Sequence, residues 1–368
     1  MKKRLVSIML VLSMAFGLVA CGGSSTEEEA PAEEATEEEA PAELTKVRWN
    51  YGGSGNVLVT IANEKGYFAE EGIEFEKVDA TQNMDAMALL AAGKVDVVSN
   101  AGTSNPLQQI AQGVDITVFG GHMVEGCMPV IAKAGTEWNG IESFVGESVA
   151  VNPSYFAFTG AVMDLGYDNP LDPEVVDWKV YSGYPDALAA VINGEVKYAL
   201  QGTQDNYGLQ ELIEAGEIEI VSYQSEIMEN YSCCRMVGQT SWVNENPDTV
   251  KAIIRALLRA QSYYEANKEE AVELHAALIG QEPEYVAAYM MDDEHYFVNA
   301  DPLKNGVVRA WGILDATGYL GEDCDVNIED HINVALYEEA LAEATELYGA
   351  EAPEFYEAQA EFFAANNK

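Results

Sequence analysis

The chain has 368 residues, with 62 acidic and 19 basic side chains and a formal net charge of −43 at pH 7. Such acidity excludes nucleic acid and anionic membrane surfaces as main partners, because like charges repel. The length exceeds what one small core usually occupies, so we expect two lobes.

The first twenty residues predict an export signal. A basic head, Met1–Arg4, precedes an apolar stretch, Leu5–Ala15, which is too short to span a bilayer comfortably. The segment Leu18–Cys21 resembles a bacterial lipobox, in which Cys21 is lipidated and becomes the mature N-terminus. The alternative is an ordinary signal peptide with an incidental cysteine.

An acidic segment follows the signal. Residues 22–43 repeat Glu, Ala and Pro and contain almost no apolar surface to bury. Such a segment cannot offset the entropy of ordering, so we expect residues 21–45 to be a lipidated, disordered tether. Signal and tether together predict an extracytoplasmic protein that a lipid anchors to the cell membrane.

From Val47 onward, short strands alternate with amphipathic helices. This order predicts a parallel sheet with helices on both faces, in which ligands lie at the carboxyl ends of the strands. We expect strands over 47–53, 73–78, 95–99 and 115–121, and helices over 56–66, 84–93 and 105–113.

The alternation starts again at Glu147. Strands are expected over 147–152, 177–183, 197–202 and 217–223, and helices over 155–166, 185–194 and 208–216. A strand over 234–243 then leads to a long helix with Asn246 as its cap and Pro247 as its first residue, and the remainder of the chain appears helical.

Two segments of the chain look alike. In Asp85–Thr103 and in Asp186–Thr203, Asp-Ala opens a helix and the following strand ends in Gly-Thr. If the similarity is real, the two lobes present matching Gly-Thr loops across a polar cleft. The alternative is that any two strand–helix units resemble each other.

Several segments are similar to the substrate-binding proteins of bacterial ABC importers, in the family that includes the alkanesulfonate, taurine, nitrate and thiamine-pyrimidine-precursor binders. The matching segments are GGSGNVLVTIANEKGYFAEEGIEFEKV (52–78), ALLAAGKVDVV, PLQQIAQGVDITVFGG, FVGESVAVNPSY and NPDTVKAIIRALLRA. The resemblance implies an α/β, type II periplasmic-binding-protein fold, with two α/β lobes joined by two hinge strands and followed by C-terminal helices. It places lobe 1 at 46–121 and 236–340, lobe 2 at 122–235, and a C-terminal helical extension at 341–368.

The same resemblance implies a receptor without catalytic residues, cofactor or metal, acting as a monomer. It would capture a small organic ligand between the lobes and deliver it to an ABC importer permease. The ligand would be a thiamine-pyrimidine precursor, another heteroaromatic, or a sulfonate- or nitrate-like anion, although few basic side chains lie near the expected loops. The first alternative is a sensor or scaffold lipoprotein without a transport role. The second is an enzyme like the pyrimidine synthases, which carry a cysteine-rich run that Ser232–Met236 of this chain matches only in part.

The candidate ligand contacts are polar or aromatic residues in loops that follow strands, where backbone N–H groups at helix starts can also bind an acceptor. They are Gly53, Ser54, Asn56, Asn100, Gly102, Thr103, Ser104, Asn152, Ser154, Tyr155, Tyr184, Gln201, Thr203, Gln204 and Arg235. The candidate hinge residues are Gly120, Gly121, His122, Cys233 and Cys234.

The adjacent cysteines Cys233 and Cys234 lack the spacing of a metal site, and a disulfide between neighbours would strain the backbone. Because the two lobe crossings run side by side in this fold, a bridge from Cys127 to one of them is an alternative. The simpler interpretation is that both cysteines pack at the back of the cleft, with Arg235 placed to meet a ligand or nearby carboxylates.

Overall fold

The computed structural model describes residues 44–52, 54–80 and 84–368. The expected export signal, the lipidation site Cys21, most of the acidic tether and Gly53 lie outside the described residues. Within the described ranges, no helix is both long and apolar enough to cross a bilayer.

The first sheet has five strands in the order β2–β1–β3–β11–β4. β1 is parallel to β2 and β3, whereas β11 returns antiparallel between β3 and β4. Its strands are β1 (Thr45–Asn50), β2 (Ile73–Lys77), β3 (Val97–Gly102), β4 (Ile116–Gly121) and β11 (Cys234–Gln239), and the early helices are α1 (Val57–Glu64), α2 (Tyr67–Glu70), α3 (Ala86–Ala91) and α4 (Ser104–Ala111).

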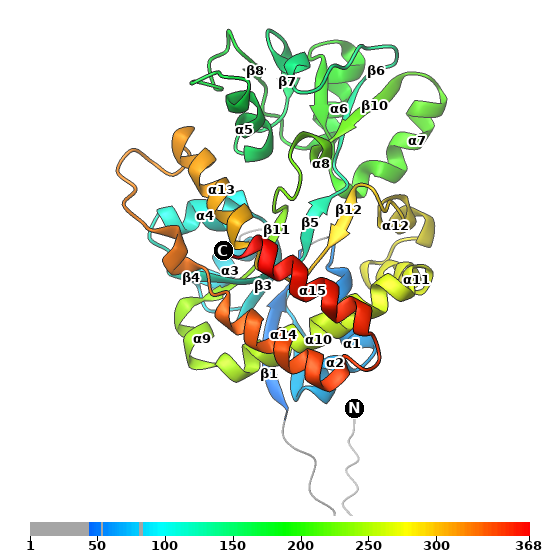
Figure 1. Ribbon diagram of the computed structural model, residues 1–368. Coiled ribbons are helices and arrows are strands. Elements are labelled where there is room, and N and C mark those ends of the chain that lie inside the picture. The colour runs from blue at the N-terminus through cyan, green and yellow to red at the C-terminus, as the bar shows by residue number, and fades with distance from the viewer. Residues whose placement is uncertain (1–43, 53, 81–83) are drawn as a thin grey trace, which may run out of the picture. The chain divides into compact units, whose positions relative to one another are not determined.

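The second sheet also has five strands, in the order β10–β6–β9–β7–β8. Figure 1 shows this sheet at the top, above the first sheet and the C-terminal helices. Its strands are β6 (Pro129–Lys133), β7 (Ser148–Ala150), β8 (Asp177–Trp178), β9 (Tyr198–Leu200) and β10 (Ile218–Tyr223), and its helices are α5 (Phe156–Asp164), α6 (Tyr184–Asn193), α7 (Asn206–Glu214) and α8 (Gln224–Ile227).

The chain passes between the sheets through residues 122–128 and 224–233. The first passage contains β5 (Met123–Gly126), which pairs antiparallel with β12 (Tyr296–Val298). The sequence predicted only helices in the region of β12, and this was wrong, because a three-residue strand is too short to show an alternating pattern. The strand expected over 177–183 is similarly reduced to the two residues of β8.

The C-terminal half is mainly helical: α9 (Thr240–Glu245), α10 (Pro247–Ala266), α11 (Lys268–Ile279), α12 (Pro283–Met290), α13 (Lys304–Ala316), α14 (Ala335–Tyr348) and α15 (Pro353–Asn366). Pro247 opens α10 as expected, but the Asn246 side chain donates to the Trp242 carbonyl instead of capping the helix. The start of the C-terminal extension proposed from the sequence, residue 341, falls inside α14, whose buried Tyr337 and Leu341 belong to the same core as α10.

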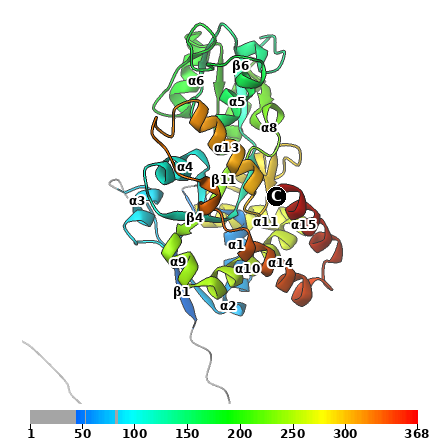
Figure 2. The same cartoon turned by 60° about the vertical axis from the view of Figure 1, so that its left-hand side comes forward.

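Two C-terminal helices touch the second sheet's helices. α13 packs against α4 and α5 (Figure 2), and α12 packs against α7. Gly160 of α5 allows the first contact, because a Cβ there would lie 2.5 Å from Ile313 Cδ1. The lobes are therefore held together on both flanks as well as through the crossing strands.

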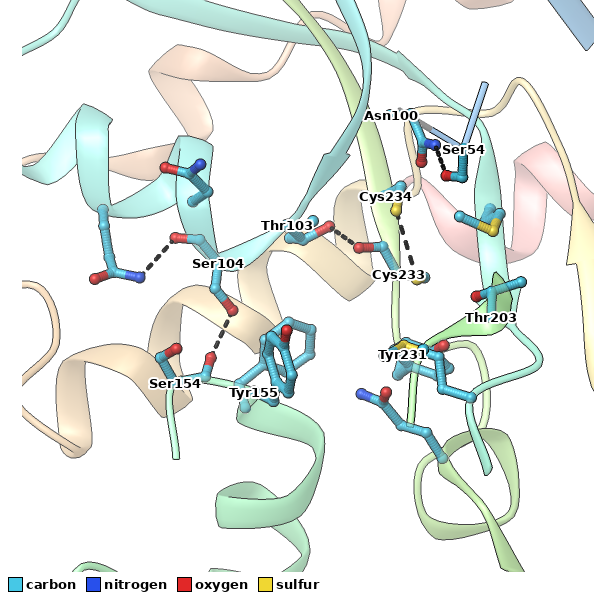
Figure 3. A pocket seen from close by; sticks show the side chains of 18 of the residues that line it. Ser54, Asn100, Thr103, Ser104, Ser154, Tyr155, Thr203, Tyr231, Cys233 and Cys234 are labelled. Carbon is cyan, nitrogen blue, oxygen red and sulfur yellow. Dashed lines mark hydrogen bonds between the residues drawn. The ribbon is translucent and has the colours of Figure 1, made fainter. Parts of the chain in front are cut away.

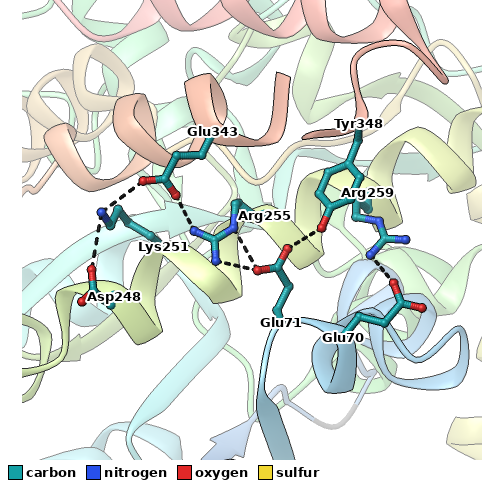
Figure 4. A network of polar contacts seen from close by, with 8 residues as sticks. All are labelled: Glu70, Glu71, Asp248, Lys251, Arg255, Arg259, Glu343 and Tyr348. Atoms are coloured by element: carbon teal, nitrogen blue, oxygen red, sulfur yellow. Dashed lines mark hydrogen bonds and ion pairs between the residues drawn. The ribbon is translucent and has the colours of Figure 1, made fainter. Parts of the chain in front are cut away.

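A network of ion pairs fastens α2 and α14 to α10 (Figure 4). The Glu71 side chain, 6% exposed, accepts from Arg255 Nε at 2.9 Å and from the Tyr348 hydroxyl at 2.8 Å. Arg255 also donates to Glu343 of α14. Because Glu71 is almost wholly desolvated, its removal takes the acceptor away from two partly buried donors, Arg255 Nε and the Tyr348 hydroxyl.

We therefore expect Glu71→Ala to lower the free energy of unfolding by about 2–3 kcal/mol in urea denaturation. Glu74→Ala is the control, because Glu74 pairs with Lys46 at the surface, where both side chains are about half exposed and such pairs contribute little. Equal effects of the two substitutions would contradict the structural role of the network.

Candidate ligand-binding site

A cavity of about 440 Å³ opens where the strand ends of the two sheets meet. This size is typical of small-molecule sites. Twelve residues singled out in the sequence line it: Ser54, Asn100, Gly102, Thr103, Ser104, Ser154, Tyr155, Tyr184, Thr203, Gln204, Cys233 and Cys234 (Figure 3). Cys233 and Cys234 were expected as hinge residues, and their presence in the wall adds two thiols to the cavity.

Side chains from the two sheets meet across this cavity. Ser104 Oγ at the start of α4 donates to the Ser154 carbonyl at 2.6 Å (Figure 3), and the Tyr155 and Tyr184 hydroxyls are 3.1 Å apart. These contacts bring the starts of α4, α5 and α6 to one place. Backbone N–H groups at helix starts attract acceptor atoms.

The two Gly-Thr segments both reach the cavity, Gly102-Thr103 from the first sheet and Gly202-Thr203 from the second. Each threonine hydroxyl donates to a carbonyl of a crossing segment, Thr103 to Ser232 and Thr203 to Gly126. The two threonines therefore hydrogen-bond the crossing segments to the sheets. Because each hydroxyl proton is used in this bond, it is not available to a ligand.

Besides Arg235, three predicted contacts lie outside the cavity wall. The buried Asn56 Oδ1 accepts from the amides of Leu58 and Val59 and so caps α1. Gln201 is buried beside β9 and donates to the Leu200 carbonyl. Asn152 lines a neighbouring hollow, and its Oδ1 accepts from Ser154 N at 3.0 Å. This hydrogen bond stabilises the loop of residues 152–154.

Arg235 was expected to meet a ligand, but the structure places it away from the cavity. Its side chain is 0% exposed and donates to the carbonyls of Asp301 at 2.8 Å and Met123 at 2.9 Å. Burial lowers the pKa of this guanidinium to about 10. Arg235 thus joins three chain segments and is not among the residues that line the cavity.

The expected hinge residues lie at the end of β4. A Cβ on Gly121 would come within 2.6 Å of the Asp301 carbonyl, so only glycine allows this close approach. Gly120 is similarly crowded by Met236. His122 is buried, and burial holds its pKa well below the ordinary value.

Amide side chains form a wall that the sequence interpretation did not include. Asn105, Gln108, Gln109 and Gln112 reach the cavity from α4 and its end, and Gln224 reaches it from the start of α8. A signal was present, because Gln108 and Gln112 are four residues apart on a helix that follows an expected site loop, and Gln224 directly follows an expected strand. Gln224 is 4% exposed, and its Oε1 has no hydrogen-bond partner among the described residues.

Among the described residues that line the cavity, none is an Asp, Glu, Lys, Arg or His. Carbonyl, amide and hydroxyl groups alternate there with Tyr155, Phe156 and Tyr184. The arrangement can bind a flat molecule through rings and neutral hydrogen bonds. Elsewhere in the described ranges, no group of three or more His, Cys, Asp or Glu side chains gathers as a metal site.

The four described cysteines are free thiols. Cys127 is buried and donates to Asp292 Oδ2 at 3.5 Å, and it forms no disulfide with Cys233 or Cys234. Cys324 lies in the loop between α13 and the 3-10 turn at Ile328–His331, outside the cavity.

His275 supports the loop that carries Ser54. Its Nε2 lies 3.0 Å from the Ser54 carbonyl and its Nδ1 lies 3.1 Å from Thr60 Oγ1. Because the carbonyl can only accept, Nε2 carries the proton and Nδ1 is the acceptor of a neutral ring. Burial lowers the pKa of His275 to about 4.

This lowered pKa predicts a pH-dependent stability difference between the wild type and His275→Gln. Between pH 6.5 and about 4 the unfolded chain binds a proton at His275 that the native ring does not. The stabilisation that His275 provides is therefore present above pH 6.5 and is lost as the pH falls. In denaturant titrations the deficit of His275→Gln at pH 7 should shrink by about 3 kcal/mol at pH 4 and stay constant above pH 7; an equal deficit at both pH values would contradict this.

Comparison with solved structures confirms the expected periplasmic-binding-protein fold. The periplasmic aliphatic sulphonate binding protein SsuA from Escherichia coli superposes with a TM-score of 0.61 at 16% identity, covering 78% of this chain and 92% of that chain. The periplasmic nitrate-binding protein NrtA from Synechocystis PCC 6803 gives a TM-score of 0.60 at 15% identity, covering 82% and 89%.

Curated relatives correct one expectation. The chain is 23% identical over 242 residues to the 4-amino-5-hydroxymethyl-2-methylpyrimidine phosphate synthase of Schizosaccharomyces pombe and 26% identical over 236 residues to that of Candida albicans. These matches cover 59% of this chain and 67% and 65% of the two relatives. The prediction that the chain is not an enzyme is contradicted, because these relatives are named as enzymes.

The family itself follows from a longer match. Residues 56–271, more than half of the chain, match the protein family described as NMT1/THI5 like. The match includes the second sheet, the first sheet except β1, both passages between them and every described residue of the cavity wall except Ser54. The chain therefore belongs to the NMT1/THI5-like family.

Proposed function

We propose that the chain is a lipid-anchored, extracytoplasmic solute-binding receptor that delivers an uncharged, flat organic molecule to an ABC importer permease. The observation that supports this most is the cavity of about 440 Å³, which lies between two sheets and has no Asp, Glu, Lys, Arg or His among its described lining residues. A lipid anchor at Cys21 would raise the concentration of the receptor near the permease.

The balance of energies favours a neutral ligand over an anion. Moving an unpaired anion out of water costs several kcal/mol, whereas a helix N-terminus returns only about 0.3–1 kcal/mol, and up to about 2 in favourable cases. No described cation in the wall makes up the difference. A heteroaromatic such as a pyrimidine avoids this cost and can pair its ring nitrogens and amino groups with the amides.

A thermal-shift panel tests the ligand class. We expect 4-amino-5-hydroxymethyl-2-methylpyrimidine or a related neutral heteroaromatic to raise the melting temperature by several degrees, because binding at 100 times Kd stabilises by about 2.7 kcal/mol. Methanesulfonate, taurine and nitrate should leave it unchanged. A shift with these charged compounds alone would overturn the neutral-ligand proposal.

The transport role needs its own experiment. Deleting the gene should abolish uptake of the ligand found in the panel, and re-expression should restore it. Neighbouring genes for an importer permease and ATPase would support transport, whereas normal uptake in the deletion strain would favour a ligand-binding sensor.

An enzyme is the second candidate, because two curated relatives are named as pyrimidine phosphate synthases. Mass spectrometry can test for formation of 4-amino-5-hydroxymethyl-2-methylpyrimidine phosphate after the purified protein is incubated with a cell extract from which all proteins have been removed. Product that depends on the protein would favour this candidate, and a bound but unchanged ligand would favour the receptor.

A further inference from the structure

Two thiols lie side by side in the wall of the cavity. The Sγ atoms of Cys233 and Cys234 are 3.5 Å apart, and both residues line the space (Figure 3). Cys233 is partly exposed, whereas Cys234 is 6% exposed. Neutral ligand binding makes no use of a nucleophile, so these groups need a separate explanation.

The surroundings of Cys233 favour its thiolate. Cys234 is placed to donate its S–H to Cys233, and the Tyr231 hydroxyl accepts from Gly126 N at 2.8 Å, which leaves its own proton for Cys233. Arg235 adds positive charge from behind the strand.

Other titratable groups also face Cys233. Glu125 opposes the negative charge and Tyr184 lies across the cavity. The hydrogen bond with Cys234, the largest cause, lowers the pKa of Cys233 against the burial that raises it, and the nearby Tyr231 hydroxyl and Arg235 add to the lowering, while the pKa of Cys234 is raised. The pair is therefore asymmetric, with Cys233 as the nucleophile and Cys234 as a hydrogen-bond donor.

We propose that Cys233 is a modification site inside the ligand cavity, where it reacts with low-molecular-weight disulfides and so closes the cavity to its ligand. The Cys233 thiolate attacks one sulfur of R–S–S–R. A bond forms between Cys233 Sγ and that sulfur, which gives the mixed disulfide Cys233 Sγ–S–R, the original S–S bond breaks, and R–S⁻ leaves and takes a proton from water. The disulfide is the only oxidant required. The consequence for binding rests on the proposed function, whereas the reaction itself does not.

The mixed disulfide should persist instead of passing to Cys234. Neighbouring Cα atoms are about 3.8 Å apart, below the roughly 4.4–6.8 Å that disulfides span without strain. The cavity also offers the attached group a partner, because the buried Gln224 Oε1 there has no hydrogen bond among the described residues. A small R group with a hydroxyl can donate to it.

The first experiment uses 2-hydroxyethyl disulfide on the reduced, purified protein at pH 7, with peptide mass spectrometry as the readout. Cys324 is the internal control, because it is also partly exposed but lies outside the cavity. We expect Cys233 to gain the adduct about tenfold faster than Cys324. Cys324→Ser should keep the fast reaction and Cys233→Ser should lose it.

Three outcomes of this experiment overturn the proposal. They are faster labelling of Cys324, no adduct on Cys233, and loss of two hydrogens across Cys233 and Cys234 without an adduct. The last would mean that the neighbouring thiol displaces the attached group.

Tyr231→Phe tests the positioning role of the tyrosine hydroxyl. Its loss should slow labelling of Cys233 about threefold to tenfold at pH 7 and move the midpoint of the rate against pH upward, because one donor to the thiolate is gone. Circular dichroism checks that the variant folds. An unchanged pH midpoint in a folded variant would exclude this role.

A final measurement separates this proposal from the proposed function. The labelled and unlabelled proteins are compared in the thermal-shift assay with 4-amino-5-hydroxymethyl-2-methylpyrimidine and the rest of the panel. Loss of the shift only after labelling supports closure, and equal shifts overturn it. If Cys233 labels but neither form responds to any probe, the proposed function fails while the modification site stands.

Discussion

Replacing Arg235 with leucine is expected to lower the free energy of unfolding by about 3–5 kcal/mol. The substitution leaves the carbonyls of Asp301 and Met123 without donors in a place that water does not reach. It also removes a positive charge that favours the ionised form of the buried Asp301 carboxyl, whose pKa burial already raises to about 6. Chemical denaturation at pH 7 measures the loss.

Arg309→Leu is a matched control for this prediction. Arg309 also donates to two backbone carbonyls, those of Glu229 and Asn230, but its side chain is exposed. Water can replace it there, so the expected loss is below about 1 kcal/mol. Similar losses in the two variants would mean that burial of Arg235 does not determine its contribution.

Arg235 also shows how far the sequence could define the site. The sequence predicted that Arg235 lies on the returning strand, but it did not predict the direction in which the side chain points. Successive side chains on a strand point to opposite faces, and Cys234, the first residue of β11, faces the cavity. Alternation alone therefore predicts that Arg235 faces away.

Cys233 departs from this alternation because the chain is not yet a strand there. Ser232 has a φ of +61°, a left-handed turn that brings Cys233 to the same side as Cys234. A single sequence gives little indication of such a turn at a serine, since φ above zero is rare for residues other than glycine.

The two-sheet fold was the more predictable part. Helices ended by glycine at Gly66 and Gly194, where the structure has φ values of +77° and +76°, marked the strand–helix order directly. β5 and β12 were missed because their pairing joins Gly126 to Tyr296, and such a distant partner leaves no local pattern.

Gln224→Leu is expected to have opposite effects on stability and on binding. In the unliganded protein Gln224 Oε1 is buried without a partner among the described residues, and removing it should raise the free energy of unfolding by about 1 kcal/mol. Ligand binding should weaken about tenfold, because a ligand N–H or O–H loses its acceptor in a desolvated cavity. Urea titration and calorimetric binding of the panel's ligand measure the two effects.

Gln261→Leu is the control, because this glutamine is equally buried but fully engaged. Its Nε2 donates to Glu265 at 3.1 Å and its Oε1 accepts from Ala300 N at 3.3 Å, and it does not line the cavity. The substitution should cost about 2–3 kcal/mol of stability and leave ligand affinity unchanged. If Gln224→Leu instead destabilises the unliganded protein as Gln261→Leu does, Gln224 is a structural residue and its free acceptor is not kept for a ligand.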